Sequence, residues 1–140
     1  MAIQLEKLTY EYMQGSALSH KAVAEVDLTV EAGEFLGLIG HTGSGKSTLV
    51  QLMGGLLQPT AGRVLVEGLD MGDKKQRAQA RRHVGLVFQY PEYQLFEETV
   101  ARDVAYGPRN MGLGEEEIQR RVDTALGLVG LPPRQFGEKS

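Results

Sequence analysis

Residues 34–48 read Glu34-Phe35-Leu36-Gly37-Leu38-Ile39-Gly40-His41-Thr42-Gly43-Ser44-Gly45-Lys46-Ser47-Thr48. An apolar run enters a loop that is rich in glycine. The loop ends in Lys-Ser-Thr and opens a segment whose apolar residues have helical spacing, Leu49-Val50-Gln51-Leu52-Met53. The spacing is G-x-x-x-x-G-K-[ST], and it stands in the order strand, loop and helix that gives this pattern its meaning.

This loop predicts a site for a chain of phosphates. Its glycines let the backbone approach the phosphate oxygens and turn successive N–H groups inward, and the following helix adds its free N–H groups and the positive end of its dipole. Lys46 can reach the β- and γ-phosphates of a nucleotide, the Ser47 hydroxyl can bind Mg²⁺, and Thr48 can donate to the α-phosphate. The candidate ligand-binding residues are Gly40, His41, Thr42, Gly43, Ser44, Gly45, Lys46, Ser47 and Thr48. His41 lies in the variable part of the loop, so we do not expect it to act as a catalytic base.

The composition is that of an ordinary globular domain. The 140 residues are 41% hydrophobic and 24% charged, with a net charge of −3 and no cysteine. The acidic balance gives no general case for nucleic-acid binding, and without cysteine disulfides and thiolate metal sites are excluded. No apolar run reaches the length of a membrane span, and we expect a cytosolic protein that a partner holds at any membrane.

Strands are predicted on both sides of the loop. Residues 2–10 and 26–30 alternate between apolar and polar, which predicts two half-buried strands, and the apolar run 35–39 predicts a buried one. A helix is predicted from Lys46 to about Leu57, followed by a short strand at 61–68 that returns to an antiparallel layer. Residues 83–88 predict a further apolar strand.

The rest of the chain is predicted to be helical or irregular. Residues 73–82 are predicted to form a short basic helix. Its charged side chains either face solvent or contact an acidic partner. An aromatic stretch follows at 90–96, which either contacts a partner or packs between subdomains. Thr99 is the predicted N-cap of a helix that Gly107-Pro108 closes, and an amphipathic helix runs from about Glu115 to Val129, with Gly130 and Pro132-Pro133 ending it.

At Gln89 the sequence reaches a second feature, and with it a resemblance. The whole chain resembles the ATP-binding subunits of ATP-binding-cassette (ABC) transporters. Gly40 to Ser47 matches the Walker A loop, Val87-Phe88-Gln89 matches the Q-loop, and Leu56-Leu57-Gln58-Pro59-Thr60-Ala61-Gly62 resembles the family's usual helix exit. The implied fold is α/β, a P-loop NTPase with a RecA-like parallel core, a small antiparallel β layer and the start of a helical subdomain. Residues 1–89 would form the β layer and Walker A core, and residues 90–140 the Q-loop and partial helical subdomain.

The resemblance assigns roles to individual residues. Lys46 and Gln89 would be catalytic, Ser47 and Gln89 would hold Mg²⁺, and ATP would be the nucleotide. In Leu8-Thr9-Tyr10-Glu11-Tyr12, the aromatic that stacks on adenine is expected to be Tyr12, with Tyr10 as the alternative. Without the resemblance, Gln89 would be an ordinary glutamine at the end of a strand, and Tyr12 an aromatic side chain that packs at a strand end.

Two details resemble a subgroup of the family. Gly-His-Thr-Gly-Ser-Gly-Lys-Ser-Thr and Phe88-Gln89-Tyr90-Pro91-Glu92-Tyr93-Gln94-Leu95-Phe96 are similar to the ATPases of energy-coupling factor (ECF) importers of vitamins and metal ions. The implied partners are a second ABC ATPase subunit, in a homo- or heterodimer, and an integral membrane coupling subunit, with no nucleic acid. The implied location is peripheral, on the cytoplasmic face of the cell membrane.

The chain also departs from the family. A signature loop such as Leu-Ser-Gly-Gly-Gln, a Walker B strand ending in Asp-Glu, and a later switch histidine are not found in the sequence. We therefore expect the N-terminal part of one ATPase domain, with one edge of the parallel sheet unpaired, and very poor ATP hydrolysis by these 140 residues alone.

Three other functions stay open at this stage. A soluble ABC ATPase of DNA repair or translation would need basic surfaces or extra domains. A small-molecule kinase would return directly to the parallel sheet after the loop helix and carry an arginine-bearing lid. A non-catalytic nucleotide-binding module would bind ATP without turnover.

Overall fold

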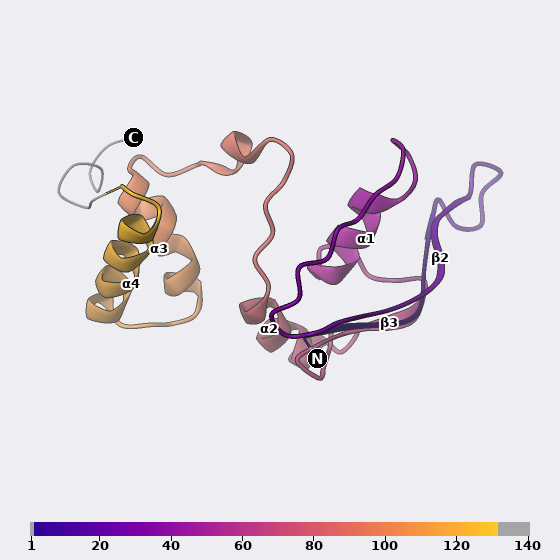
Figure 1. Cartoon of the computed structure of the whole chain (residues 1–140), viewed down its shortest axis with the longest axis horizontal. Helices are drawn as coiled ribbons and strands as arrows, with labels where there is room; N and C mark the ends of the chain where they lie inside the picture. Colours follow the sequence, from indigo (N-terminus) through magenta and orange to yellow (C-terminus); the bar gives the residue numbers. More distant parts are fainter. Residues whose placement is uncertain (1, 132–140) are drawn as a thin grey trace. The chain divides into compact units, whose positions relative to one another are not determined.

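A computed structural model describes residues 2–131 of the chain (Figure 1). The chain divides into two compact units, one up to Leu86 and the other from Val87 onward. The first unit carries the sheet and the glycine-rich loop, and the second carries a pair of helices. Each unit is described by itself.

The first unit is built on a four-stranded antiparallel sheet. Its strands are β1 (Ile3–Tyr12), β2 (His20–Val30), β3 (Ala61–Val66) and β4 (Leu69–Asp70), in the order β2-β1-β3-β4. The predicted antiparallel layer is therefore confirmed, including the return of the 61–68 strand to it. Glu67 and Gly68, with φ of 48° and 78°, form the two-residue turn between β3 and β4, a conformation that suits the twist of the strands.

Strand β2 begins six residues earlier than predicted, because bulges interrupt the alternation on which the prediction depended. Lys7 and Glu25 both have positive φ, 44° and 46°, and the β1–β2 register shifts nearby. Side chains of the opposite strand stabilise both bulges: Asp27 Oδ1 accepts from the Lys7 N–H (2.8 Å), and Thr9 Oγ1 accepts from the Glu25 N–H (2.9 Å). Such bulges bend and twist the strand pair.

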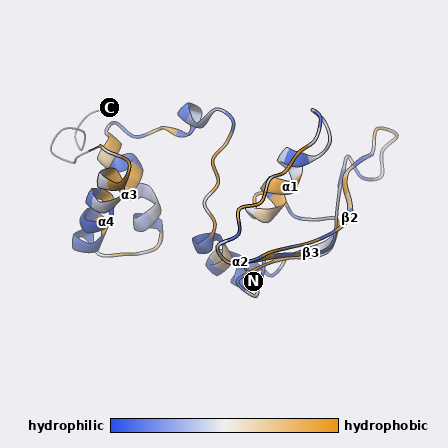
Figure 2. Ribbon diagram, viewed as in Figure 1, coloured by the Kyte–Doolittle hydropathy of each residue, from blue (hydrophilic) through white to orange (hydrophobic). Residues whose placement is uncertain are grey.

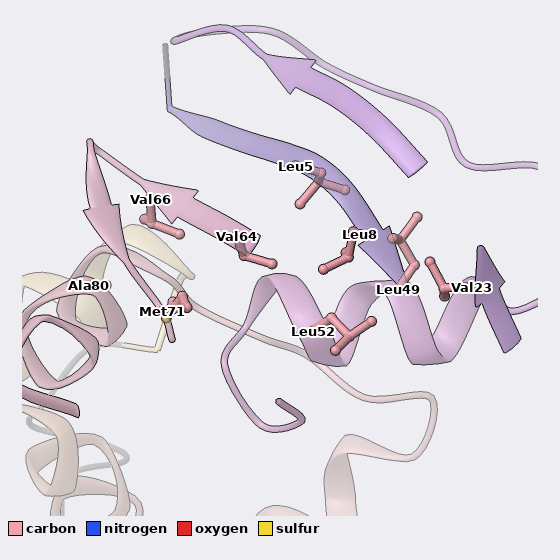
Figure 3. Packing of buried hydrophobic residues seen from close by; sticks show 9 residues of the cluster. All are labelled: Leu5, Leu8, Val23, Leu49, Leu52, Val64, Val66, Met71 and Ala80. Atoms are coloured by element: carbon pink, nitrogen blue, oxygen red, sulfur yellow. The ribbon is translucent and has the colours of Figure 1, made fainter. Parts of the chain in front are cut away.

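Helix α1 (Lys46–Met53) packs on the sheet and closes the first core (Figure 3). Leu8 of β1 and Leu52 of α1 are completely buried. The buried cluster comprises Leu5, Leu8, Val23, Leu49, Leu52, Val64, Val66, Met71 and Ala80. The helix stops at Met53 instead of Leu57, because Gly54 caps it and Gly55 turns to a φ of 70°.

The basic segment is helical, as predicted. Helix α2 runs over Lys74–Ala80, and the short 3₁₀ helix η1 follows at Arg81–His83. The Asp73 carboxylate accepts from the backbone N–H groups of Lys75 and Gln76 and so caps the start of α2. Most of this helix is open to solvent, and Ala80 is its buried residue.

The strands predicted at 35–39 and 83–88 are wrong for this structure. Residues 34–41 and 84–88 carry no regular secondary structure, and among residues 2–131 neither segment pairs with a strand. A strand exists through hydrogen bonds to a neighbour, so an apolar run without one stays irregular. Its side chains are left in solvent: Phe35 is fully exposed and Ile39 is 97% exposed, and the run is orange in Figure 2.

The second unit is a helix pair preceded by the short 3₁₀ helix η2 (Pro91–Gln94). Helices α3 (Val100–Asn110) and α4 (Glu115–Leu128) lie side by side in Figure 1. Their buried core consists of Ala105, Ile118, Val122 and Leu126, and the last three lie four residues apart on one face of the predicted amphipathic helix α4. On its outer surface, hydrogen bonds from Arg121 and Arg120 lower the pKa of Glu117.

Thr99 caps α3 as predicted, and its hydroxyl accepts from the Arg102 N–H at 3.3 Å. The predicted end of this helix at Gly107-Pro108 is wrong, since α3 continues to Asn110. Proline removes one N–H from the ladder, but the helix continues past it, and the Met111 N–H donates to the Gly107 carbonyl (3.1 Å). The predicted end at Pro132-Pro133 lies outside the described residues.

Replacing Leu52 by alanine should lower the free energy of unfolding by about 2–5 kcal/mol, because a cavity opens between α1 and the sheet. Leu56→Ala is the matched control, since Leu56 is half exposed and its truncation should cost far less. Urea denaturation measures both variants. Equal losses for the two would contradict this packing.

Candidate nucleotide-binding site

The glycine-rich loop lies open to solvent at the start of helix α1. Residues Gly40 to Ser44 are exposed, and Ser47 in the first turn of the helix is exposed as well. The loop has its own turn, in which the Ser44 N–H donates to the His41 carbonyl at 3.1 Å. A ligand from solution therefore has direct access to the loop backbone.

The Lys46 ammonium is held inside the curve of the loop. Its Nζ donates to the carbonyl oxygens of Gly40 (2.5 Å) and His41 (2.7 Å) and to Ser44 Oγ (3.2 Å). An ammonium group has three donors, and all three meet neutral oxygens here. Because no carboxylate is among these partners, the positive charge is free to attract an anion.

Gly45 is the residue that lets the loop turn into the helix. Its φ is 92°, a left-handed conformation that side chains rarely adopt, and a Cβ at this position would lie 2.2 Å from the Ala22 carbonyl oxygen of β2. The loop therefore depends both on the backbone freedom of glycine and on the missing side chain. Strand β2 therefore packs directly against the loop at Gly45.

The first turn of α1 offers unpaired N–H groups. The Leu49 N–H donates to the Gly45 carbonyl at 2.9 Å, so the N–H groups of residues 46–48 precede the first bond of this ladder. No acidic residue lies in this turn. Free N–H groups and the positive end of the helix dipole together form a binding site for anions.

Tyr12, predicted to stack on adenine, lies beside the same turn. Its hydroxyl is 2.9 Å from Thr48 Oγ1, and its ring contacts the edge of the Tyr10 ring at 4.8 Å between centroids and an interplanar angle of 81°. The end of β1 is thus joined to the start of α1. The structure brings Tyr12, Lys46, Ser47 and Thr48 together within one unit.

The two remaining predicted site residues are His41, in the loop itself, and Gln89, in the second unit. His41 Nδ1 lies 2.9 Å from the Thr42 carbonyl, a local contact at the exposed loop. Gln89 is an exposed residue of the second unit, whereas the loop belongs to the first. The role of Gln89 as a metal ligand stays a prediction.

The sequence reasoning missed the part of β2 that supports the loop. Ala22 lies four residues before the strand predicted at 26–30, and its carbonyl faces Gly45. The available signal was the short run around Val23, which is buried in the first core. The bulge at Glu25 separates Val23 from Val26 and hides the alternation that would have joined them.

The glycine-rich loop, the left-handed Gly45 and the start of α1 define a P-loop nucleotide-binding protein. The sequence profile of the family described as "ABC transporter" matches residues 23–138. The chain belongs to the ABC transporter family.

Curated relatives support the same subgroup that the loop variant resembles. The chain is 54% identical over 141 residues to the energy-coupling factor transporter ATP-binding protein EcfA2 of Clostridium acetobutylicum, covering 100% of this chain and 49% of the relative. It is 58% identical to EcfA2 of Symbiobacterium thermophilum, covering 95% and 46%. The chain spans about half the length of the curated relatives it matches.

Solved structures are similar in fold. CbiO1 from Clostridium perfringens, part of the ABC transporter complex CbiONQ, aligns with a TM-score of 0.78 and 35% identity over 96% of this chain and 53% of that one. A dimeric structure of the ATP-binding cassette MJ0796 bound to ADP and Pi aligns with a TM-score of 0.80 and 26% identity, covering 98% and 61%. The predicted class of fold, an ABC-type P-loop NTPase, is confirmed.

Two features are absent from the described part of the chain. Within residues 2–131 no helix combines the length and the apolar character that crossing a membrane requires. Over the same residues, no group of three or more His, Cys, Asp or Glu side chains is arranged to hold a metal ion.

Replacing Gly45 by alanine should lower the free energy of unfolding by more than Gly43→Ala does. Both glycines have positive φ, 92° and 84°, and holding an alanine in this conformation should lower the free energy of unfolding by about 1–2 kcal/mol at each position. Only the Gly45 variant adds the collision with Ala22, since nothing lies within 4 Å of a Cβ at Gly43. Urea denaturation compares the two, and equal losses would show that β2 does not support the loop.

Proposed function

We propose that this chain binds and hydrolyses ATP as part of an ATP-binding subunit that energises an ECF-type importer of a vitamin or metal ion. One observation carries the proposal: the Lys46 ammonium is held on neutral oxygens within an exposed glycine-rich loop at the start of α1. The names of the relatives support the transport role over that of a soluble ABC ATPase.

The loop residues would act on the triphosphate. The N–H groups of the loop and first turn would bind phosphate oxygens, and Lys46 would neutralise charge on the β- and γ-phosphates. Because phosphoryl transfer develops charge on these oxygens, a fixed ammonium beside them lowers the barrier as well as the dissociation constant. Tyr12 would provide a flat face for adenine.

The residues present fit Mg²⁺. Ser47 is exposed in the first turn and has an oxygen of the kind that Mg²⁺ prefers, and the Gln89 amide would add a second. When bound, Mg²⁺ neutralises phosphate charge. Mg²⁺ commonly takes one or two protein oxygens, with phosphates and waters completing the octahedron, so the lack of a carboxylate cluster in residues 2–131 is compatible with this site.

The proposal includes two partner subunits. A second ATPase subunit would close the site, and an integral membrane subunit would receive the movement of residues 89–96. Tyr90, Tyr93 and Phe96 are all more than half exposed and are available for contact with that subunit. The working location would be the cytoplasmic face of the membrane, where the chain is held by this partner.

Replacing Lys46 by alanine should weaken ATP binding by about tenfold to a hundredfold, because the positive charge that attracts the phosphates is lost. Isothermal titration of the complete gene product with ATP measures the loss. The matched control is Lys75→Ala, which removes an exposed lysine of α2. An unchanged affinity for ATP in the Lys46 variant would refute the assignment of the site.

Replacing Ser47 by alanine should remove the gain in ATP affinity that Mg²⁺ provides. The normal protein should bind ATP more tightly in MgCl₂ than in EDTA, whereas the variant should show nearly the same dissociation constant in both. Ser16→Ala in the exposed β1–β2 loop should behave as the normal protein does. A Ser47 variant with a normal response to Mg²⁺ would remove this residue from the metal site.

A further inference from the structure

The hydroxyl groups of Tyr12 and Thr48 link two parts of the site that are 36 residues apart in the sequence. Their oxygens lie 2.9 Å apart, with Tyr12 at the end of β1 and Thr48 in the first turn of α1. Thr48 is only 6% exposed, and over residues 2–131 this is the one hydrogen bond of its side chain. Tyr12 is 40% exposed.

The direction of this hydrogen bond follows from the chemistry of the two groups. A phenol O–H is more acidic than an aliphatic one, so Tyr12 is the better donor and Thr48 the better acceptor. A hydroxyl that accepts one hydrogen bond still has its own hydrogen to donate. Thr48 Oγ1 therefore keeps one donor available beside the free N–H groups of residues 46–48.

A donor that is already accepting a hydrogen bond is favoured in two ways. Its rotamer is fixed before the ligand arrives, so less side-chain entropy is lost on binding. Its O–H is also polarised by the first bond, and each bond in such a chain strengthens the next.

We propose that Tyr12 acts on the phosphate end of the nucleotide through Thr48, in addition to any contact with the base. The Tyr12 O–H donates to Thr48 Oγ1, and the Thr48 O–H donates to a phosphate oxygen. Thr48 is then the residue in contact with the ligand, and Tyr12 is a positioning residue. The inference rests on the proposed function, because it requires that phosphates bind in this loop.

The structure allows the hydroxyl of Tyr12 to be removed without displacing its ring. The Tyr10 and Tyr12 rings pack edge-to-face with their centroids 4.8 Å apart, and Tyr12→Phe retains that contact. Thr48→Val keeps the size of a buried side chain while deleting its hydroxyl. After this change the Tyr12 hydroxyl can bond to water, because Tyr12 is partly exposed.

The test uses a ligand that has phosphates and no base. Inorganic tripolyphosphate and ATP are titrated, in Mg²⁺, into the complete gene product carrying Tyr12→Phe, Thr48→Val or both. Tyr12→Phe should weaken tripolyphosphate binding about threefold to tenfold, the size of one hydrogen bond. The double variant should bind no more weakly than Thr48→Val alone, since the two hydroxyls act as one chain.

Two further variants separate positioning from a purely structural role. Tyr10→Phe removes the hydroxyl of the neighbouring ring and should leave tripolyphosphate binding unchanged. Thr48→Ser restores a hydroxyl on the first turn and should restore both the affinity and its dependence on Tyr12.

The inference is overturned if Tyr12→Phe binds tripolyphosphate as tightly as the normal protein does, or if the losses in the double variant add. A different result identifies failure of the proposed function itself. If the normal protein and the Lys46→Ala variant bind tripolyphosphate and ATP equally, the loop is not the phosphate site, and both proposals fall.

Discussion

The packing of helix α1 against the antiparallel sheet fixes the geometry of the phosphate loop. Leu49 and Leu52 are buried against Leu5 and Leu8, so the first turn of the helix cannot move without opening the core. The loop is held from the other side by the Ala22 carbonyl, which comes within 2.2 Å of any Cβ at Gly45. Lys46 then closes the curve of the loop by donating to the carbonyl oxygens of Gly40 and His41.

The same unit places its most exposed apolar side chains directly before this loop. Phe35 and Ile39 are surrounded by solvent, although the residues that follow them are well organised. The loop does not need a paired strand at 35–39 to form its turn, because its contacts are with β2, with Lys46 and within itself. In the described part of the chain, the contacts that shape the loop therefore do not include strand pairing by residues 35–39.

Local signals in the sequence predicted the helix after the loop and several other elements well, and long-range strand pairing was predicted less well. The spacing around Lys46, the alternation in β1 and β3, and the threonine that caps α3 each depend on a few neighbouring residues. The start of β2 was missed because of the bulge at Glu25, whose positive φ cannot be predicted from a glutamate in the sequence. The apolar run 35–39 has the composition of a buried strand, but composition cannot supply the neighbour with which a strand pairs. The contact between Tyr12 and Thr48 joins positions 36 apart, and periodicity says nothing about such a pair.

The edge-to-face arrangement of Tyr10 and Tyr12 has an optical consequence. Two phenol rings at 4.8 Å and 81° form a chiral pair of coupled chromophores, and the chain contains no tryptophan whose stronger bands would cover theirs. The near-ultraviolet circular dichroism of these 140 residues thus contains a contribution from the Tyr10–Tyr12 pair beside the proposed nucleotide site, together with that of the Tyr90–Tyr93 pair. A ligand that turns the Tyr12 ring relative to Tyr10 would change this contribution without any attached dye.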